Sequence, residues 1–254
     1  MKNQLPLPGR FAHWAFFLDV DGTLADIAPT PCAVTIADHT RDILSRLVAA
    51  CDGAVALISG RALAEVDRLF APLHLPVAGL HGLERRDSRG QVSRAAREVP
   101  ALRTARGALE KFAADHPGAL IEDKDITLAL HFRQAPAAEA DAEALIAELI
   151  ATSNGALMVQ RAKMVLELRP GGGDKGTAVR AFMTEPPFAG RLPVFVGDDV
   201  TDEAGFATIN EMNGISIRVG DGMPTCARHD GASVAAIHEW LDAVANALGD
   251  PPAG

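Results

Sequence analysis

The chain has 254 residues, 48% of them hydrophobic, and carries a net charge of −9 at pH 7. This size and apolar content predict a sizeable core, in one large domain or in one domain that carries a smaller one. The acidic balance argues against nucleic acid or an anionic membrane as a partner, although a bound metal ion can still recruit an anionic substrate. The three cysteines have no metal spacing, and no apolar run suits a leader or a membrane span. We therefore expect a cytoplasmic protein, and a monomer, that acts on a small molecule.

Short apolar runs alternate with helical patterns toward both ends of the chain. The runs are typical of buried strands, and the segments between them place apolar residues on one helical face. Strands that alternate with helices predict an α/β fold with a doubly wound, Rossmann-like parallel sheet. In chain order, the strands and helices expected for this core are 14–18, 38–50, 54–58, 62–70, 174–184, 193–197, 201–209, 215–219 and 233–248.

The middle of the chain follows a different pattern, which indicates a smaller inserted α+β unit. Glycine-bearing segments at 78–84 and 169–176 border it and are typical of hinges. This organisation divides the chain into a core of residues 1–82 and 172–254 and an insert of residues 83–171. The elements expected within the insert are strands near 91–99, 126–133, 156–160 and 164–168, and helices at 100–115 and 137–152.

Polar side chains stand where the core strands end. Asp19 and Asp21 follow the first strand in "FFLDVDGTL", Ser59 follows the second, and Asp198 follows the strand at 193–197. Ligands of open α/β sheets bind outside the carboxyl ends of the strands, so we expect these side chains to share one site. Lys175, at the start of the helix before the last of these strands, joins them.

These residue types suit phosphoryl transfer. Carboxylates that would repel one another can instead hold Mg²⁺, which prefers hard oxygen ligands, and we take Mg²⁺ as the expected cofactor. With the metal present, Asp19 could attack phosphorus, and Asp21 could donate a proton to the leaving alkoxide. Ser59 could hold phosphoryl oxygens, and Lys175 could stabilise the negative charge that develops.

Other interpretations of the same residues remain open. A calcium loop that starts at Asp19 is disfavoured, because Leu24 and Thr30 occupy the positions that need glycine and glutamate. Gly171, Gly173 and Gly176 match a dinucleotide-binding pattern, which on its own is a weak signal. Ser59 could simply cap the helix at 62–70. His81 could contact substrate or support the hinge. Asp199 and Asp202 could support the site, cap a helix or bind the metal directly.

Four motifs in order resemble those of the haloacid-dehalogenase-like (HAD) phosphohydrolases: "FFLDVDGTL", "ALISGRAL", the isolated Lys175 and "VFVGDDVTDE". The resemblance covers the whole chain. It implies a Mg²⁺-dependent mechanism with an aspartyl-phosphate intermediate, in which Asp19 is the nucleophile and Asp198 binds the metal. It also implies that Asp21 binds the metal through its backbone carbonyl, which leaves its carboxyl group free for acid–base work.

Within the HAD phosphohydrolases, the chain resembles the trehalose-6-phosphate phosphatase family in particular. The segments that carry this resemblance are "GLHGLE", "IEDKDITLALHFR" and "KMVLELRP". The resemblance implies that the insert is a cap that grips the sugar of trehalose 6-phosphate. Lys163 and Glu167 could instead be a plain ion pair on one strand face. The residues expected to bind substrate are Gly22, Thr23, Gly60, Arg61, His81, Glu122, Lys124, Arg133, Lys163 and Glu167.

The sequence leaves three other functions open. A related enzyme could act on another sugar phosphate, such as sucrose phosphate or a phosphohexose. A signalling domain could accept a phosphoryl group on Asp19, although the acid–base Asp21 and the large insert argue against a switch. A binding protein without activity is disfavoured because no catalytic position is missing.

Overall fold

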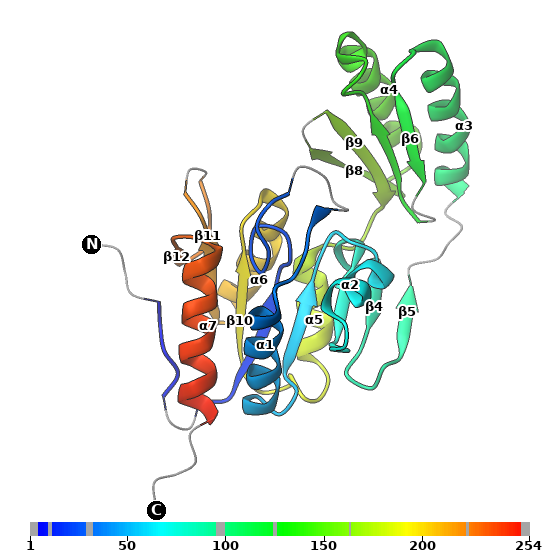
Figure 1. The fold of residues 1–254 in the computed structure, drawn as a ribbon. Helices are drawn as coiled ribbons and strands as arrows, with labels where there is room; N and C mark the ends of the chain where they lie inside the picture. Colours follow the sequence, from blue (N-terminus) through cyan, green and yellow to red (C-terminus); the bar gives the residue numbers. More distant parts are fainter. Residues whose placement is uncertain are drawn as a thin grey trace, which may run out of the picture. The chain divides into compact units, whose positions relative to one another are not determined.

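The computed structural model describes residues 5–9, 12–28, 33–94, 100–123, 126–162, 164–221 and 224–249. The chain forms two compact units, one of residues 1–93 with 174–254 and one of residues 94–173. Figure 1 shows the elements of both units. Within the described residues, no helix combines the length and the apolar content needed to cross a bilayer.

The large unit is built on one eight-stranded sheet. Its strands follow the order β12-β11-β10-β1-β2-β3-β4-β5, and the pairs from β12 to β3 are parallel while β3 and β4 are antiparallel. The predicted doubly wound parallel sheet is therefore confirmed. The strands are β1 (Trp14–Leu18), β2 (Val55–Ile58), β3 (Val77–Gly79), β4 (Glu84–Arg86), β5 (Val92–Arg94), β10 (Leu192–Gly197), β11 (Ile215–Val219) and β12 (His229–Gly231).

Aromatic packing shows that helices cover both faces of this sheet. Consecutive strand residues point to opposite faces: Phe16 meets Trp240 of α7, while Phe17 packs against Phe182 of α5. Helices α1 and α7 lie side by side, as do α5 and α6 (Figure 1). All five residues of β1 are consequently buried. The helices of this unit are α1 (Asp38–Ala50), α2 (Leu63–Phe70), α5 (Lys175–Met183), α6 (Glu203–Glu211) and α7 (Val234–Gly249), with short 3₁₀ turns η2 (Leu80–Gly82) and η4 (Val200–Asp202).

The small unit is a four-stranded sheet with its own core. The strand order is β6-β7-β9-β8, and all neighbours are antiparallel. Leucines that alternate along β7 and β9 form this core together with apolar residues of the two helices. The elements are α3 (Pro100–Asp115), β6 (Leu120–Asp123), β7 (Leu128–His131), η3 (Pro136–Ala138), α4 (Glu139–Thr152), β8 (Leu157–Ala162) and β9 (Val165–Pro170).

The structure differs from the sequence prediction at the start of the insert. The sequence predicts a strand at 91–99 within the small unit, but the described part of that strand, β5, belongs to the large sheet beside β4. Residues 95–99 lie outside the described chain. Strands β3, β4, β6 and β12 were not predicted, because each has only three or four residues and offers no readable periodicity.

Candidate active site

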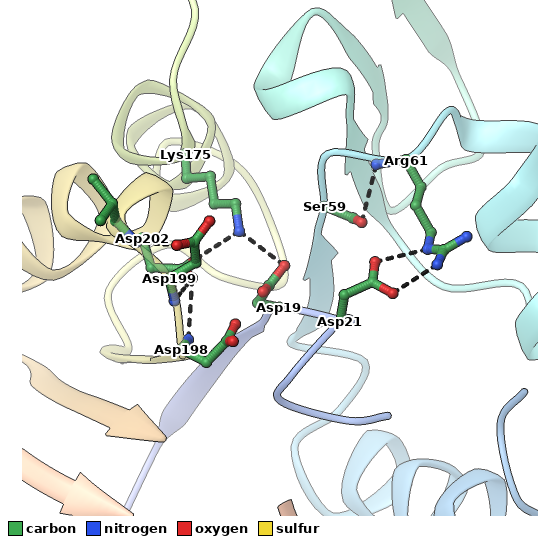
Figure 2. A network of polar contacts seen from close by, with 9 residues as sticks. Asp19, Asp21, Ser59, Arg61, Lys175, Asp198, Asp199 and Asp202 are labelled. Atoms are coloured by element: carbon green, nitrogen blue, oxygen red, sulfur yellow. Dashed lines mark hydrogen bonds and ion pairs between the residues drawn. The ribbon is translucent and has the colours of Figure 1, made fainter. Parts of the chain in front are cut away.

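Three neighbouring strands bring the predicted polar residues to one edge of the large sheet. Leu18, the last residue of β1, is in register with Val196 of β10 and with Leu57 of β2. Asp19 therefore emerges between the ends of β10 and β2. The carboxyl ends of these parallel strands place Asp198 on one side of Asp19 and Ser59 on the other, as Figure 2 shows.

Asp19 forms part of a buried network with Lys175 and Asp202 (Figure 2). Lys175 Nζ lies 2.8 Å from Asp19 Oδ1 and 2.6 Å from Asp202 Oδ1, and its side chain is only 2% exposed. Burial alone would lower the pKa of Lys175, but the two carboxylates outweigh this effect and raise that pKa above its usual value. Lys175 therefore stays charged and holds one oxygen of Asp19 in place.

Asp198 completes a cluster of acidic oxygens. Asp19, Asp198 and Asp202 each offer a carboxylate oxygen, and these oxygens lie within 4.8 Å of one another. Asp198 Oδ1 is buried and has no hydrogen-bond partner among the described residues. Burial, with a contribution from Asp202, raises the pKa of Asp198 to about 6. Burial, again with Asp202, also raises the pKa of Asp19 well above its usual value, although Lys175 opposes the shift.

The cluster fits a divalent cation with oxygen ligands. It contains three carboxylates and one ammonium group, so a cation would balance the remaining negative charge. The buried Asp198 Oδ1 would gain the partner that no described residue provides. Asp202 is less suited to direct contact, because Oδ1 accepts from Lys175 while Oδ2 accepts from the backbone N–H groups of Asp198, at 3.1 Å, and Asp199, at 3.0 Å. Oxygen donors of this kind suit Mg²⁺.

Asp21 faces away from this cluster and toward Arg61 (Figure 2). Arg61 Nε donates to Asp21 Oδ2 at 2.7 Å, and Arg61 Nη2 donates to Asp21 Oδ1 at 2.6 Å. The Asp21 side chain is 38% exposed, while that of Arg61 is 7% exposed. The two-point pair fixes the plane of the Asp21 carboxylate at the open side of the site.

Ser59 lies on the other side of Asp19 and is fully buried. Its Oγ accepts the backbone N–H of Arg61 at 3.1 Å, which leaves the hydroxyl proton for another acceptor. Ser59 does not cap α2: the first helical N–H, that of Leu63, donates to Glu84 Oε2 at 2.9 Å. The capping interpretation of Ser59 is therefore wrong for this helix.

Close approach explains the two glycines among the predicted residues. Gly22 has φ +79°, and a Cβ there would lie 2.0 Å from Asp198 Oδ2, so glycine lets the Asp19–Asp21 turn contact Asp198. A Cβ at Gly60 would lie 2.6 Å from Nε2 of His81. His81 is itself in the left-handed region with φ 55°, and is buried. Thr23 is fully buried beside Gly22.

Asp199 is exposed and caps its own turn. Its Oδ1 accepts the backbone N–H of Val200 at 2.7 Å, at the start of η4. Of the roles left open for Asp199 and Asp202, the geometry therefore favours a cap for Asp199 and a supporting role behind Lys175 for Asp202.

The predicted sugar-binding residues that the structure describes belong to the small unit. Register pairs Glu122 with Ala129 and Ala129 with Glu167, so both glutamates lie on the same face of the small sheet. Glu122 contacts His131 Nε2 at 3.0 Å, and Glu167 accepts from Thr127 Oγ1 at 2.6 Å. Arg133 is exposed in the turn after β7. Lys124 and Lys163 lie outside the described residues.

Two interactions of the site were not predicted from the sequence. One is the pair between Asp21 and Arg61, and the other is the support that Asp202 gives to Lys175. Glu84 was also missed as the residue that accepts the first N–H of α2. The only signal for Glu84 is its place at the end of "GLHGLE", a segment singled out for its resemblance alone.

Comparisons with known proteins show the family and the fold to which this chain is similar. A family model described as "Trehalose-phosphatase" matches residues 17–234. Trehalose-6-phosphate phosphatase of Escherichia coli is 43% identical over 241 residues, which cover 95% of this chain and 90% of that protein. A solved structure of a trehalose-6-phosphate phosphatase related protein is 26% identical, with TM-score 0.74 over 92% of this chain and 98% of that one. A HAD-superfamily phosphatase of Bacteroides thetaiotaomicron shares the fold, with TM-score 0.60 and 18% identity over 98% of this chain and 99% of that one.

Proposed function

Because this chain belongs to the trehalose-phosphatase family and is therefore a phosphoric monoester hydrolase, we propose that it hydrolyses trehalose 6-phosphate with Mg²⁺ through a phosphorylated Asp19. The observation that carries this proposal is the buried arrangement of Asp19, Lys175 and Asp198 at the sheet edge. It presents one fixed carboxylate beside a charged ammonium group and a second carboxylate whose buried oxygen has no partner in the described part of the chain.

Asp19 and Asp198 would hold Mg²⁺ through their carboxylates, together with the backbone carbonyl of Asp21. When bound, the ion would supply the positive charge that lets a phosphate dianion approach two carboxylates. Both carboxylate oxygens of Asp21 accept hydrogen bonds from Arg61, which supports a role for the Asp21 side chain other than metal binding. Asp202 would hold Lys175 and the backbone of Asp198 in position without binding the metal.

In the first step, an oxygen of Asp19 would attack phosphorus while the bond from phosphorus to the sugar oxygen breaks. Asp21 would donate a proton to that departing oxygen. Ser59, whose hydroxyl proton is not used by its own contact with Arg61, would donate to a phosphoryl oxygen. Lys175 would stabilise the charge on the transferred group.

In the second step, water would attack the phosphorus of the phosphorylated Asp19. Asp21, now a carboxylate, would accept the proton of this water, and inorganic phosphate would leave with Asp19 restored. In the structure both oxygens of Asp21 accept hydrogen bonds from Arg61, which suits this base role. The acid role of the first step requires Asp21 to turn away from Arg61, because a protonated carboxyl group cannot accept at both oxygens.

The large unit would act as the catalytic core and the small unit as the cap that recognises the sugar. Glu122 and Glu167 share one sheet face, which supports a surface of acceptors for sugar hydroxyls. Arg133, Lys124 and Lys163 would add positive charge. Gly22, Thr23, Gly60, Arg61 and His81 would surround the phosphate in the core.

The test is phosphate release from trehalose 6-phosphate by the wild-type protein and by Asp19→Asn. We expect the wild type to turn over with Mg²⁺, to stop after chelation and to recover when Mg²⁺ returns. An acid quench during turnover should leave a phosphoryl group on the peptide that contains Asp19. Substantial turnover by Asp19→Asn would refute the assignment of the nucleophile. A wild type that becomes stably phosphorylated without releasing phosphate would indicate a signalling domain instead.

A further inference from the structure

Helices α1 and α7 bring two histidines together on the surface of the large unit. His39 Nε2 lies 3.2 Å from His238 Nδ1, and the ring planes meet at 76° with centroids 5.1 Å apart. We propose that these two imidazoles form a binding site for a divalent transition-metal ion of the Zn²⁺ class, separate from the Mg²⁺ site.

The hydrogen bonds of His238 prepare one of its nitrogens for a metal. His238 Nε2 lies 3.0 Å from the backbone carbonyl oxygen of Leu24, which can only accept. Nε2 therefore carries the proton, and Nδ1 carries a lone pair that points toward His39. Metal-binding histidines commonly donate their second N–H to a carbonyl in this way, because the bond fixes both the tautomer and the ring orientation.

The distance between the two facing nitrogens matches a shared ion. In a tetrahedral Zn²⁺ site with metal–nitrogen bonds of about 2.0–2.1 Å, two ligand nitrogens stand about 3.3–3.4 Å apart. The 3.2 Å separation of His39 Nε2 and His238 Nδ1 needs little adjustment to reach that value. His39 is exposed, so its proton can move from Nε2 to Nδ1 by exchange with water when the ion binds.

Further ligands are available in the same place. The histidines line an open surface depression of about 590 Å³ that also contains Asp42 and Glu239. Asp42 follows His39 by three residues in α1, so the two side chains share one helix face. Within the described part of the chain, the carboxylates of Asp42 and Glu239 form no hydrogen bond or ion pair. Asp242, in the same depression, is instead paired with Arg46. A carboxylate that changes rotamer, or water, would complete the coordination.

The chemistry of the ligands distinguishes this site from the one at the sheet edge. Imidazole nitrogen suits Zn²⁺, Cu²⁺ and Ni²⁺, whereas an all-oxygen set suits Mg²⁺. Burial, with a smaller contribution from His39, lowers the pKa of His238, so this imidazole is neutral and able to bind a metal near pH 7. A bound ion would connect α1, α7 and, through Leu24, the turn that follows Asp21.

Titration of Zn²⁺ into the protein at saturating Mg²⁺, followed by calorimetry, tests the site. We expect one saturable Zn²⁺ per chain, at least about tenfold weaker in His39→Ala and in His238→Ala. His74→Ala, which removes an exposed histidine elsewhere in the large unit, is the matched control and should bind like the wild type. His39→Ala changes an exposed position in the first turn of α1 to the best helix former, so it should fold normally.

Electron paramagnetic resonance of bound Cu²⁺ gives a second readout. Coupling to two imidazole nitrogens should appear in the wild type and in His74→Ala, and coupling to one of them should be lost in His39→Ala, because the oxygen ligands at the sheet edge cannot replace it. Equal Zn²⁺ affinity in the wild type and both histidine variants would overturn the proposal. The absence of saturable binding in the wild type, or a two-nitrogen pattern that is unchanged in His39→Ala, would overturn it as well.

Discussion

Replacing Asp202 with alanine should destabilise the protein strongly, because this carboxylate is fully buried and supports three donors. It accepts from Lys175 Nζ at 2.6 Å and from the backbone N–H groups of Asp198, at 3.1 Å, and Asp199, at 3.0 Å. Alanine leaves all three donors without this acceptor. Of the residues that the structure describes, Lys175 then keeps Asp19 alone as a partner, at 2.8 Å.

The expected cost follows from these contacts. A buried N–H that loses its acceptor costs about 1–3 kcal/mol, and removing one partner of a buried ion pair costs about 3–5 kcal/mol. The terms overlap, and loss of Asp202 also relieves its repulsion with Asp19 and Asp198. We therefore expect a total near the pair value alone, about 3–5 kcal/mol, which corresponds to a fall in Tm of about 6–20 °C for a unit of this size.

Urea unfolding followed by circular dichroism, with a thermal scan in parallel, measures this effect. Asp199→Ala is the matched control, because Asp199 is exposed and makes one capping bond to Val200, so its loss should cost only about 0.5–2 kcal/mol. If the two variants lower the free energy of unfolding equally, Asp202 does not stabilise the buried network, and Lys175 does not depend on Asp202 as its partner.

Two further predictions concern the catalytic groups. Arg61→Ala should lower kcat for trehalose 6-phosphate by about 10²-fold, because Asp21 loses its orientation. Arg61→Lys should restore little of this activity, since an ammonium group cannot make the two-point contact with the carboxylate. Full activity in the lysine variant would contradict this role of Arg61. Mg²⁺ should raise Tm more at pH 7.5 than at pH 5, because Asp198, with a pKa of about 6, must lose its proton to bind the ion. Without Mg²⁺ the sign reverses: the pKa of Asp198 is raised above 3.8 in the folded state, so its contribution to stability is greatest below about pH 4 and declines as the pH rises to about 6. Thermal scans at several pH values check both signs, and Asp198→Asn should lose the Mg²⁺ effect.

The sequence predicted the core of the fold because its strands are continuous apolar runs. The segment Trp14–Leu18 is buried on both faces and stops at Asp19, so the strand and its polar end could both be identified. The short strands at the sheet margins could not, because three residues such as His229–Gly231 show no period. The sequence places the start of the insert at residue 83 because the glycine-bearing segment 78–84 is typical of a hinge, whereas the structure adds β4 and β5, which follow this segment, to the large sheet.

The sequence could predict which residues lie in the candidate site, but not which of them pair with one another through hydrogen bonds and ion pairs. Strand ends and motif order were enough to predict that Asp19, Ser59, Lys175 and Asp198 share one site. The partners of Asp21 and Lys175 are 40 and 27 residues away along the chain, and no local pattern links them. Only the fold shows that Asp21 is paired with Arg61 and that Asp202 stands behind Lys175.

The most direct test of the proposed function is phosphate release across a panel of sugar phosphates. A site that pairs its acceptors with specific hydroxyls rejects analogues strongly, so we expect kcat/KM for trehalose 6-phosphate to exceed that for sucrose 6-phosphate and glucose 6-phosphate by at least about 100-fold. Glu122→Ala should reduce this preference while leaving the hydrolysis of para-nitrophenyl phosphate nearly unchanged. Equal kcat/KM values across the panel, or a higher value for another sugar phosphate, would contradict the proposal that trehalose 6-phosphate is the substrate.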